Sequence, residues 1–510
     1  MDQKKLLEQS KKNLLELIFS RTTLILLLLI VNFLVLFSFL LGFFEGLPVY
    51  LGSTVLFTAI VLIYVLNTKA NPSVKLSWCI LIGIMPIFGT ALYFYVRSDL
   101  GHRMVKRIVH SSVAESLPQA ENPPLPADVP DIAHYLKEHG HAEAYTNSSL
   151  QYFPLGELAF EEMLRQMEAA EQYIFLEYFI IEPGQMWNRM LDVLYRKAQS
   201  GVEVRVLYDG TCAITMLPAN YPKQLQKLGI QCKAFATVRP FVSTHYNYRD
   251  HRKILIVDGR TAFTGGINLA DEYINAKEKY GHWKDNALMI QGQAVQGFTL
   301  LFLQMWNYSE RERIFEPYLH LPEPVSADGC VIPFGCGPSE SEQIGKMVYL
   351  NLLNQAKHDV YIMTPYLILD GEMVTALQFA ARRGVDVRLI LPHIPDKQYA
   401  FLLARCHYQE LLEAGVQIYE YTPGFVHSKI FLCDDIQGVV GTINLDYRSL
   451  YHHYECAAYL WKTPVLTDIK ADFMETFEKS QQNVTIDTMK KPSLFTRMVT
   501  AILKLLAPLM

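Results

Sequence analysis

Residues 251–258 read HRKILIVD, and residues 427–434 read HSKIFLCD. Both stretches hold histidine, lysine and aspartate at the same positions, with an apolar run between the lysine and the aspartate. A short apolar run of this kind is typical of a buried strand. A turn of small residues follows each stretch at the same distance, GGIN at 265–268 and GTIN at 441–444. Both halves of the chain therefore carry one pattern, H-x-K-x4-D-x6-G-[GT]-x-N.

A second pair of similar segments lies upstream of these motifs. Residues 201–207 read GVEVRVL and residues 384–390 read GVDVRLI, each a glycine turn that leads into a strand pattern. Internal repeats of this length indicate two copies of one α/β unit, packed about a pseudo-twofold axis. We therefore predict a duplicated α/β sandwich, with one repeat at 131–325 and the other at 326–489.

The N-terminal region, 1–110, is more apolar than the rest of the chain. Uncharged runs cover 22–44, 48–66 and 77–96, and about 20 apolar residues suffice to cross a bilayer as a helix. The distribution of basic residues favours two spans and a re-entrant third segment that bends at a proline. Three plain spans with an extracytoplasmic body are the alternative. The sequence thus predicts a membrane-embedded helical module in a multi-pass cell-membrane protein, with the body in the cytoplasm.

Two segments flank the predicted repeats. Residues 111–130 are rich in proline and read as a linker. Residues 490–510 combine apolar and basic residues at helical spacing, which predicts an amphipathic helix. That helix would either lie on a membrane surface or pack on the body.

Composition excludes several classes of protein. Of 510 residues, 50% are hydrophobic and 19% are charged, which excludes a disordered chain. The net charge of −5 does not fit a basic nucleic-acid binder, and we expect no nucleic-acid partner. The eight cysteines contain no C-x-x-C pair, so we expect scattered thiols in a reducing compartment and neither a disulfide framework nor a zinc site.

The repeated motif carries the chemistry of a phosphodiester site. Side chains at i and i+2 of a strand share a face, so His251 points with Lys253 and His427 points with Lys429. Two copies placed face to face would surround a phosphate with two imidazoles and two ammonium groups. One imidazole can attack phosphorus to form a phosphohistidine while the other transfers protons. A metal site fits less well, because the two ammonium groups would repel a cation.

The paired motif resembles that of the phospholipase D superfamily, and its surroundings are similar to those of bacterial cardiolipin synthases. The matching stretches are NYRDHRK (247–253), GGINLADEY (265–273), WKD (283–285), TPY (364–366), PGFVHSK (423–429) and GTINLDYRS (441–449). The apolar hairpin with Pro86 and Gly89 resembles the membrane module of that family. The resemblance covers 48–510. It departs from the family in the added run at 22–44 and in YHHY at 451–454, where the family tends to have Leu-Asn.

The resemblance implies a phosphatidyltransferase. Two phosphatidylglycerol molecules would give cardiolipin and glycerol through a covalent phosphohistidine, with no metal and no other cofactor. The substrates are lipids, which accords with the predicted membrane segments. A homo-oligomer is compatible with the sequence, which does not determine the oligomeric state.

The paired residues receive roles from the motif and from the resemblance. We expect His251 to be the nucleophile, because the family uses the first copy, and His427 to be the acid and base. The symmetry of the sequence alone does not distinguish them. Lys253 and Lys429 are expected to bind the phosphate. The catalytic motif is completed by the two aspartates that end the strands, which we expect to fix neighbouring loops: Asp258 and Asp434.

Further residues are expected to support the site. Two asparagines would hydrogen-bond phosphate oxygens or stabilise turns: Asn268 and Asn444. Four small residues let the backbone turn tightly beside the pocket: Gly265, Gly266, Gly441 and Thr442. Two acids are candidates to orient a catalytic imidazole, with an exposed salt bridge as the alternative: Asp285 and Glu455.

Other functions remain open from the sequence. Water or another alcohol could resolve the same phosphohistidine, giving a hydrolytic phospholipase D or a transferase with a different acceptor. A nuclease of the superfamily would not need the apolar segments. A membrane scaffold with a vestigial site would predict eroded motifs, whereas both copies here are complete.

Overall fold

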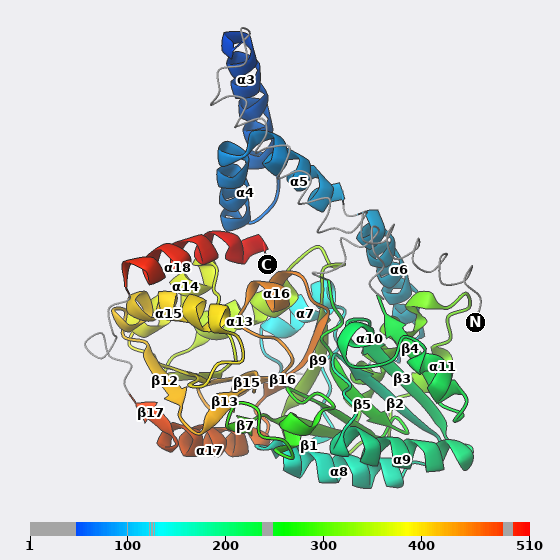
Figure 1. The fold of residues 1–510 in the computed structure, drawn as a ribbon. Helices are drawn as coiled ribbons and strands as arrows, with labels where there is room; N and C mark the ends of the chain where they lie inside the picture. The colour runs from blue at the N-terminus through cyan, green and yellow to red at the C-terminus, as the bar shows by residue number, and fades with distance from the viewer. Residues whose placement is uncertain are drawn as a thin grey trace, which may run out of the picture. The chain divides into compact units, whose positions relative to one another are not determined.

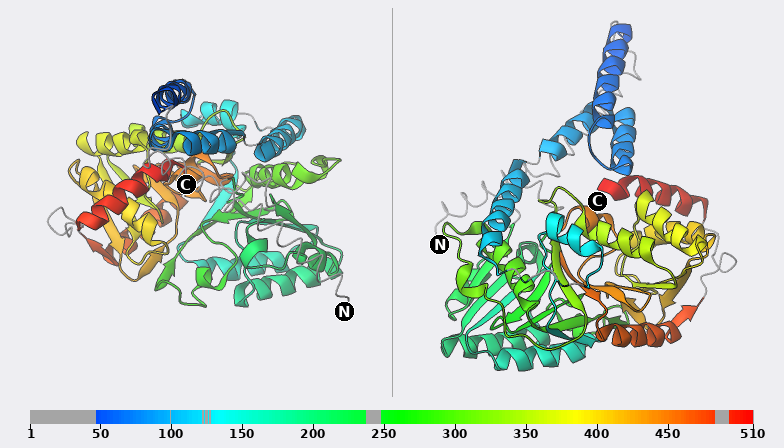
Figure 2. Two further views of the ribbon diagram at one scale, coloured as in Figure 1. Left: turned by 45° about the horizontal axis from the view of Figure 1, so that its top comes forward. Right: turned by 180° about the vertical axis from the view of Figure 1, so that it is seen from behind.

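A computed structural model describes residues 47–98, 100–121, 123, 126, 128–236, 248–482 and 493–509 (Figures 1 and 2). The chain forms two compact units, which we describe separately. The first comprises Met1–Met104, Val238–Tyr246 and Lys504–Met510, and the second comprises Val105–Thr237 and Asn247–Leu503.

The N-terminal unit is helical. Its described elements include α3 (Leu47–Leu66), α4 (Pro72–Ile84), α5 (Pro86–Ser98) and the short 3-10 turn Ala507–Leu509. A small apolar core holds them together: Val61, Val65, Trp78, Ile82 and Tyr93. The helix α4 starts with a proline in its first turn, after Asn71 accepts a hydrogen bond from the backbone N–H of Ser73 at 2.9 Å.

The third apolar run is broken into two helices. Pro86 lacks the N–H that a continuous helix would need, so the chain bends between α4 and α5. Gly89 has no side chain to keep α5 away from the backbone of Ile82, and the two helices approach closely there. The predicted break at 77–96 is therefore confirmed.

The span predicted at 48–66 is not supported. These residues form α3, but no helix in the described part of the chain has both the length and the apolar character needed to cross a membrane. The predicted span at 22–44 lies outside the described residues.

The second unit contains two mixed sheets, as the repeats predicted. The first has the order β1-β8-β6-β5-β2-β3-β4, and the second has the order β17-β12-β11-β10-β14-β15-β16-β9. The first-sheet strands are β1 (Ser148–Phe153), β2 (Tyr173–Tyr178), β3 (Glu203–Asp209), β4 (Gln231–Phe235), β5 (Lys253–Val257), β6 (Thr261–Gly265) and β8 (Ala287–Gly292). The second-sheet strands are β9 (Cys330–Cys336), β10 (Asp359–Met363), β11 (Asp386–Pro392), β12 (Gln417–Tyr421), β14 (Ile430–Cys433), β15 (Gln437–Gly441), β16 (Glu455–Trp461) and β17 (Ser480–Gln482).

The two sheets share one topology. In each, three strands run parallel (β2-β3-β4 and β10-β11-β12), and an antiparallel meander continues from the first of them (β5-β6-β8 and β14-β15-β16). The motif strands are thus β5 and β14, which occupy equivalent central positions. The duplication predicted from the sequence is confirmed.

Helices fill the space between the sheets and cover their outer faces (Figures 1 and 2). The inner helices are α12 (Val295–Trp306), all of whose residues are buried, and α17 (Val465–Glu478). They share an apolar core with strands of both sheets. The outer and shorter helices are α8 (Gly156–Glu168), α9 (Gln185–Gln199), α10 (Cys212–Thr215), α11 (Tyr221–Gln226), α13 (Ile344–Gln355), α14 (Gly371–Arg382), α15 (Gln398–Leu412) and α16 (Tyr447–Tyr451).

Three peripheral helices complete the described chain. The long α6 (Leu100–Ser116) leads into the predicted linker. The helix α7 (Ile132–Gly140) lies within the predicted first repeat but packs in the core of the second, against α13 and β9. The C-terminal α18 (Leu494–Leu506) is amphipathic, and none of its residues is buried.

Candidate active site

The two motifs meet where the two repeats join. Their histidines and lysines are at most 7% exposed. The backbone N–H of His251 donates to the carbonyl of Tyr454 at 2.9 Å, and that of His427 donates to the carbonyl of Lys284 at 2.7 Å. On the second side, β7 (His282–Lys284) pairs with β13 (Gly424–Val426) in a small parallel sheet. Each motif is therefore clamped to the segment just before a carboxylate of the opposite repeat.

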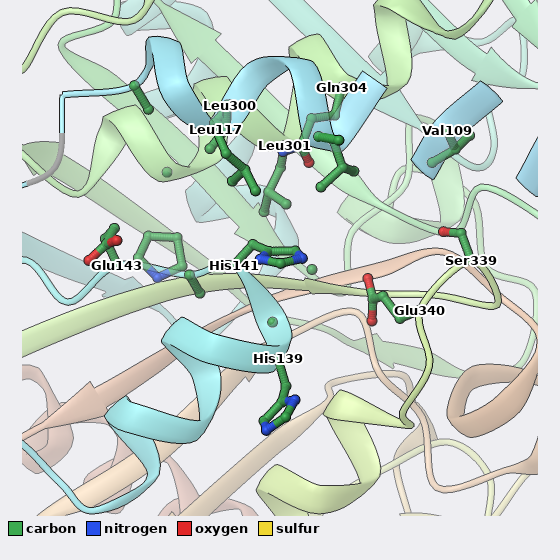
Figure 3. Close-up of a pocket in the computed structure, with 18 of the residues that line it drawn as sticks. Val109, Leu117, His139, His141, Glu143, Leu300, Leu301, Gln304, Ser339 and Glu340 are labelled. Atoms are coloured by element: carbon green, nitrogen blue, oxygen red, sulfur yellow. The ribbon is translucent and has the colours of Figure 1, made fainter. Parts of the chain in front are cut away.

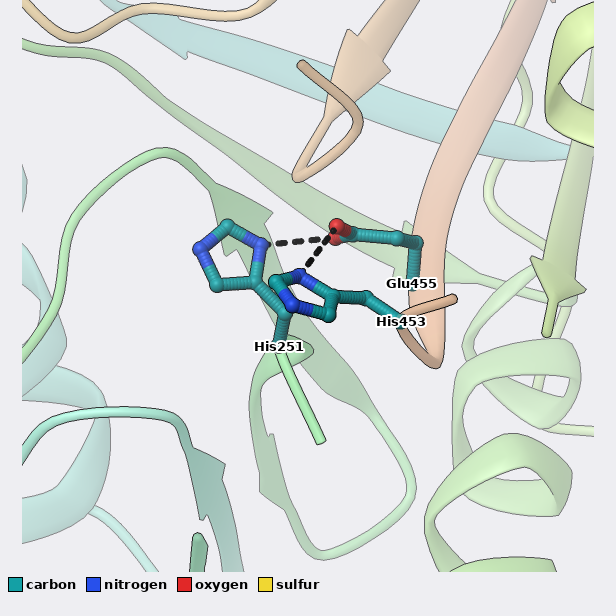
Figure 4. A group of neighbouring side chains, drawn as sticks. All are labelled: His251, His453 and Glu455. Atoms are coloured by element: carbon teal, nitrogen blue, oxygen red, sulfur yellow. Dashed lines mark hydrogen bonds and ion pairs between the residues drawn. The ribbon is translucent and has the colours of Figure 1, made fainter. Parts of the chain in front are cut away.

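The half-site of His251 is built around Glu455 (Figure 4). Nδ1 of His251 lies 2.8 Å from Oε2 of Glu455, which is fully buried. The hydroxyl of Thr442 donates to the same oxygen. Nδ1 of His453 lies 3.6 Å from the other carboxylate oxygen, and its ring is 5.3 Å from that of His251. The ring of Phe179 lies 4.9 Å from that of His251 and 6.4 Å from that of His453.

The half-site of His427 repeats this plan with different side chains. Nδ1 of His427 lies 2.7 Å from Oδ2 of Asp285, which is also fully buried. The indole N–H of Trp283 donates to Asp285 at 3.4 Å, and the two aromatic rings, Trp283 and His427, are 5.4 Å apart. The ring of Tyr273 meets His427 edge-on at 5.4 Å. Both predicted acids thus contact a motif histidine, and each contacts the motif of the opposite repeat.

The two lysines contact their own motifs. Nζ of Lys253 donates to the carbonyl of His251 at 2.7 Å. Nζ of Lys429 donates to the carbonyl of His427 and also lies 2.8 Å from its Nδ1. That nitrogen cannot donate to Asp285 and accept from Lys429 at once. We assign the proton to Nδ1, since Lys429 has the carbonyl as an alternative acceptor and Asp285 is shielded from water.

Burial shapes the protonation of the site. Burial lowers the pKa of Lys429 to about 7 and that of Lys253 to about 8, although nearby carboxylates oppose the shift. Burial and the Lys429 ammonium lower the pKa of His427 to about 4. Burial also takes the pKa of His251 well below its usual value, against the pull of Glu455. The imidazoles are therefore neutral at pH 7.

The two carboxylates are held in the ionised form. Burial alone would raise the pKa of Glu455, but His251 and His453 more than offset it, so this pKa lies below its usual value. Burial acts in the same way on Asp285, and His427 and Lys429 again bring the net pKa below normal. Each imidazole thus faces a carboxylate that can fix its Nδ1–H tautomer.

The motif aspartates lie away from this chemistry. Asp258 and Asp434 follow the far ends of β5 and β14, seven residues after the histidines, which corresponds to about 23 Å of extended chain at roughly 3.3 Å per residue. Each carboxylate accepts three backbone N–H bonds from the loop before a neighbouring strand: those of residues 171–173 and of residues 357–359. Both aspartates therefore hold loops in place in this structure, and their grouping with the catalytic residues stays a prediction.

The asparagines differ between the repeats. Oδ1 of Asn268 accepts from the backbone N–H of Ile180 at 3.1 Å, and its amide donates to Tyr273 at 2.8 Å. Asn268 therefore ties a turn in place. Asn444 is 4% exposed, and its Oδ1 has no hydrogen-bond partner within the described residues. Asn444 thus retains an acceptor that suits a hydroxyl donor and not a phosphate oxygen.

The small residues make room for close packing. A side chain on Gly265 would overlap the backbone of Asn286, and Gly265 has φ of 147°, a conformation that favours glycine. A side chain on Gly266 would overlap Oδ1 of Asp285, and one on Gly441 would overlap the backbone of β16. Gly266 thus leaves the space in which the carboxylate sits.

One group of described residues could hold a cation by geometry alone. Donor atoms of His251, His453 and Glu455 lie within 4.8 Å of one another. The set offers a single carboxylate, already bonded to His251 and Thr442, and Lys253 is close enough to act on Glu455 electrostatically. The donor chemistry therefore suits a hydrogen-bonded imidazole better than a metal ion.

The sequence reasoning missed the aromatic and imidazole neighbours of the site. Trp283 and His453 each stand two residues before the carboxylate of their half-site, and both stack near the opposite motif's histidine. Sequence reasoning assigned His453 to the rim or to a structural role. The equal spacing from the two carboxylates is the signal that could have identified them.

Comparison with known proteins places these features in a family. A family model described as "Cardiolipin synthase, PLD-like domain" matches residues 163–306 and 349–479, and one described as "Phospholipase_D-nuclease N-terminal" matches 56–97. The chain belongs to the cardiolipin synthase family of phospholipase D-like proteins. A cardiolipin synthase of Geobacillus thermodenitrificans is 34% identical over 92% of this chain and 94% of its own length.

Further relatives and one solved structure are also similar to this chain. A cardiolipin synthase of Geobacillus kaustophilus is 32% identical over 92% of this chain and 96% of its own length, and an uncharacterised Streptococcus mutans protein is 49% identical over 88% of this chain and 99% of its own. Among solved structures, phosphatidylserine synthase of Haemophilus influenzae superposes with a TM-score of 0.55 at 14% identity, covering 71% of this chain and 95% of that one. That likeness concerns the fold of the duplicated body.

Proposed function

We propose that this protein is a phosphatidyltransferase that makes cardiolipin from two molecules of phosphatidylglycerol. The observation that carries the proposal is the pair of half-sites. Each has a buried imidazole whose Nδ1 is bonded to an ionised carboxylate, with a lysine two residues away. A fixed Nδ1–H leaves Nε2 as the nitrogen for nucleophilic attack or proton transfer. The names of the relatives supply the substrate.

In the first step, Nε2 of His251 attacks the phosphorus of one phosphatidylglycerol. A P–N bond forms and the P–O bond to the terminal glycerol breaks. The departing glycerol oxygen takes a proton from Nε2 of His427. The bound phosphodiester is negatively charged, which raises the pKa of His427 above its value of about 4. The charge thereby favours the protonated form of His427. Lys253 and Lys429 neutralise the phosphate oxygens as charge moves onto them.

In the second step, the terminal hydroxyl of another phosphatidylglycerol attacks the same phosphorus. His427, now neutral, accepts the hydroxyl proton, the P–N bond breaks, and cardiolipin leaves. The proton given to glycerol is thereby recovered, so the enzyme returns to its starting state. Two phosphatidylglycerols have become one cardiolipin and one glycerol.

The proposal extends to the membrane. Exposed apolar side chains line α3 (Val55, Leu56, Phe57, Ile60 and Ile63) and α18 (Leu494, Phe495, Met498 and Ile502). Apolar surface of this amount favours contact with lipid. We propose that the N-terminal unit is embedded in the cell membrane and that the catalytic body acts at its cytoplasmic face.

The test is turnover of phosphatidylglycerol alone by the full chain in mixed micelles with EDTA, followed by lipid mass spectrometry. Cardiolipin and glycerol in equal amounts are expected. Phosphatidic acid without cardiolipin would replace the proposal with a hydrolase. Absence of any product from phosphatidylglycerol would exclude it as the donor.

A further inference from the structure

A large cavity lies in the catalytic unit, apart from the two half-sites (Figure 3). Its volume is about 630 Å³, within the range of small-molecule pockets. It is enclosed by α6, by the end of α7 and the segment after it, by α12, and by β9 with its following loop. All of the residues that line the cavity belong to one compact unit.

The cavity lies on the opposite side of the first motif from the catalytic centre. Arg252 stands between His251 and Lys253 in an extended segment, so its side chain points the other way. Its Nη1 donates to the carbonyl of Leu301 on α12 at 3.0 Å, and it lines the cavity. Gly335 of β9 makes space for the guanidinium, because a side chain there would crowd Leu301 and Arg252.

One side of the cavity is apolar. The side chains that form it come from α6, α12 and the start of the linker: Val109, Val113, Leu117, Leu300, Leu301 and Met305. Figure 3 shows Leu117, Leu300 and Leu301 together on one side, facing His141 and Glu340. A continuous aliphatic wall of this kind suits a hydrocarbon chain and offers few partners to a polar ligand.

The opposite side carries nitrogen groups. His139 and His141 lie at and just after the end of α7, close enough to each other and to His110 of α6 that both neighbours lower the pKa of His141, after the effect of burial. Lys137 is also there and pairs with Glu143 at 2.9 Å. The charges of Lys137 and Glu143 offset each other. The three imidazoles remain, and each can donate a hydrogen bond to an anion.

The inner polar wall also favours an anion. Arg252 is 4% exposed, and its Nε has no hydrogen-bond partner among the described residues. Glu340 faces it, but burial raises the pKa of Glu340 to about 8, so its carboxyl is largely neutral at pH 7. Behind Arg252, burial raises the pKa of Asp250 to about 7 and that of Glu177 well above normal. The carboxyl groups near Arg252 therefore do not cancel the positive charge of its guanidinium.

We propose that this cavity binds a single-chain anionic amphiphile, with its acyl chain along α6 and α12 and its headgroup at the imidazoles. A lysophospholipid and a free fatty acid share this chemistry. The site is separate from the transfer reaction, so the proposal stands or falls independently of the function proposed above.

Photolabelling of the full chain in nanodiscs tests this directly. The probe is lysophosphatidylglycerol with a diazirine in its acyl chain, followed by mass spectrometric mapping of the labelled peptides. Label is expected on peptides of α6 and α12, in the wild type and equally in a His251→Ala, His427→Ala double variant. Label confined to the half-sites, or no label on α6 and α12, would overturn the proposal.

A cavity-filling variant and its control sharpen the result. Ala114→Trp, from an exposed cavity-lining position, is expected to reduce labelling of α12 at least tenfold, whereas Gln119→Trp, which does not line the cavity, should leave it unchanged. Ala120→Phe serves if the first variant fails to fold. Equal labelling of a filled and an open cavity would refute the site.

Competition identifies the headgroup. Palmitate and unlabelled lysophosphatidylglycerol are expected to displace the probe at least tenfold better than the uncharged monopalmitoylglycerol. A triple variant, His110→Gln, His139→Gln and His141→Asn, should abolish this difference. Asparagine suits position 141 because φ there is 51°. Equal competition by all three lipids in the wild type would exclude the anionic headgroup.

Discussion

The half-sites of His251 and His427 are built on one plan but differ at three positions. Glu455, Thr442 and His453 surround the first histidine, where Asp285, Gly266 and Trp283 surround the second. Two features are common to both half-sites. Each motif is hydrogen-bonded through its backbone to the opposite repeat, and that repeat also supplies the carboxylate that contacts the histidine. The duplication thus supplies the geometry twice, and the side chains that differ decide what each imidazole does.

The contacts of the two lysines separate the roles further. Among the described residues, Nζ of Lys253 hydrogen-bonds the carbonyl of His251, whereas Lys429 also lies 2.8 Å from Nδ1 of His427. An ammonium group beside an imidazole lowers its proton affinity, which suits a group that must give a proton to a leaving glycerol. Glu455 instead stabilises the positive charge that His251 acquires when its P–N bond forms. This difference supports His251 as nucleophile.

Removal of either imidazole should give the largest effect. His251→Ala and His427→Ala should each lower kcat at least ~10⁴-fold, since nucleophile and general acid act as a unit. With phosphatidylglycerol labelled at phosphorus, acid-free quenching of His427→Ala should retain protein-bound label, and His251→Ala should retain none. Label on His251→Ala alone would reverse the assignment. Normal turnover by either variant would remove the two-histidine mechanism.

The orienting carboxylates should come next. Glu455→Gln and Asp285→Asn keep shape but allow the wrong imidazole tautomer, so kcat should fall ~10²- to 10⁴-fold with little change in KM. The loss should be larger for Glu455→Gln, because two imidazoles and Thr442 face that oxygen pair. A matched control is Glu372→Gln, an exposed acid on α14. Losses in KM alone would mean that the acids bind substrate rather than orient histidines.

The sequence predicts the features that depend on local patterns, and it does not predict those that depend on contacts between distant segments. The motif strands and the duplicated sheets follow from local patterns, and β5 and β14 lie where those patterns put them. Asp285 and Glu455 could be proposed as partners of histidines, but not to which histidine each belongs. That pairing is set by β7 against β13 and by Tyr454 against the first motif, which are contacts between distant segments.

Other misses have a similar origin. The sequence did not decide whether Asn268 binds phosphate or stabilises a turn, because its partners, Ile180 and Tyr273, are brought to it by tertiary packing. The position of α7 in the second repeat also follows from packing, since nothing in its own pattern selects one sheet over the other.

Substitutions at Gly266 and Thr442, the equivalent turn positions, test directly how the turn affects each half-site. Gly266→Ala would push a methyl group into Oδ1 of Asp285, displace the carboxylate and lower kcat about 10²-fold by misplacing His427. Thr442→Gly would make the first half-site resemble the second and should cost only about tenfold, because Glu455 keeps its bond to His251. Steady-state kinetics and thermal unfolding of both variants would check this. Equal losses would show that the turn acts through stability and not through the carboxylates.

The depressed pKa of His427 predicts a pH dependence of stability. Its folded pKa is about 4, and an unfolded histidine titrates near 6.5. As the pH falls from about 6.5 toward 4, the unfolded chain takes up a proton that the folded chain does not, so stability falls. His427→Gln should therefore show a shallower decline of Tm between pH 7.5 and 5. The control His358→Gln, at an exposed position, should follow the wild type, and identical slopes in all three would contradict the burial of a neutral imidazole.

The finest distinction between the half-sites is His453 opposite Trp283, because His453 places a ring nitrogen 3.6 Å from its carboxylate. The ring of His453 also lies 5.3 Å from that of His251 and 6.4 Å from that of Phe179, so it packs against both the carboxylate and the imidazole. His453→Gln keeps a polar side chain beside Glu455 and should lower kcat less than about fivefold, whereas His453→Ala removes both contacts and should lower kcat more. His452→Ala, at the neighbouring imidazole that contacts Tyr248, is the matched control and should leave kcat unchanged. Equal kcat values of His453→Ala and the wild type would show that His453 does not position His251 and would restore the equivalence of the two half-sites at this position.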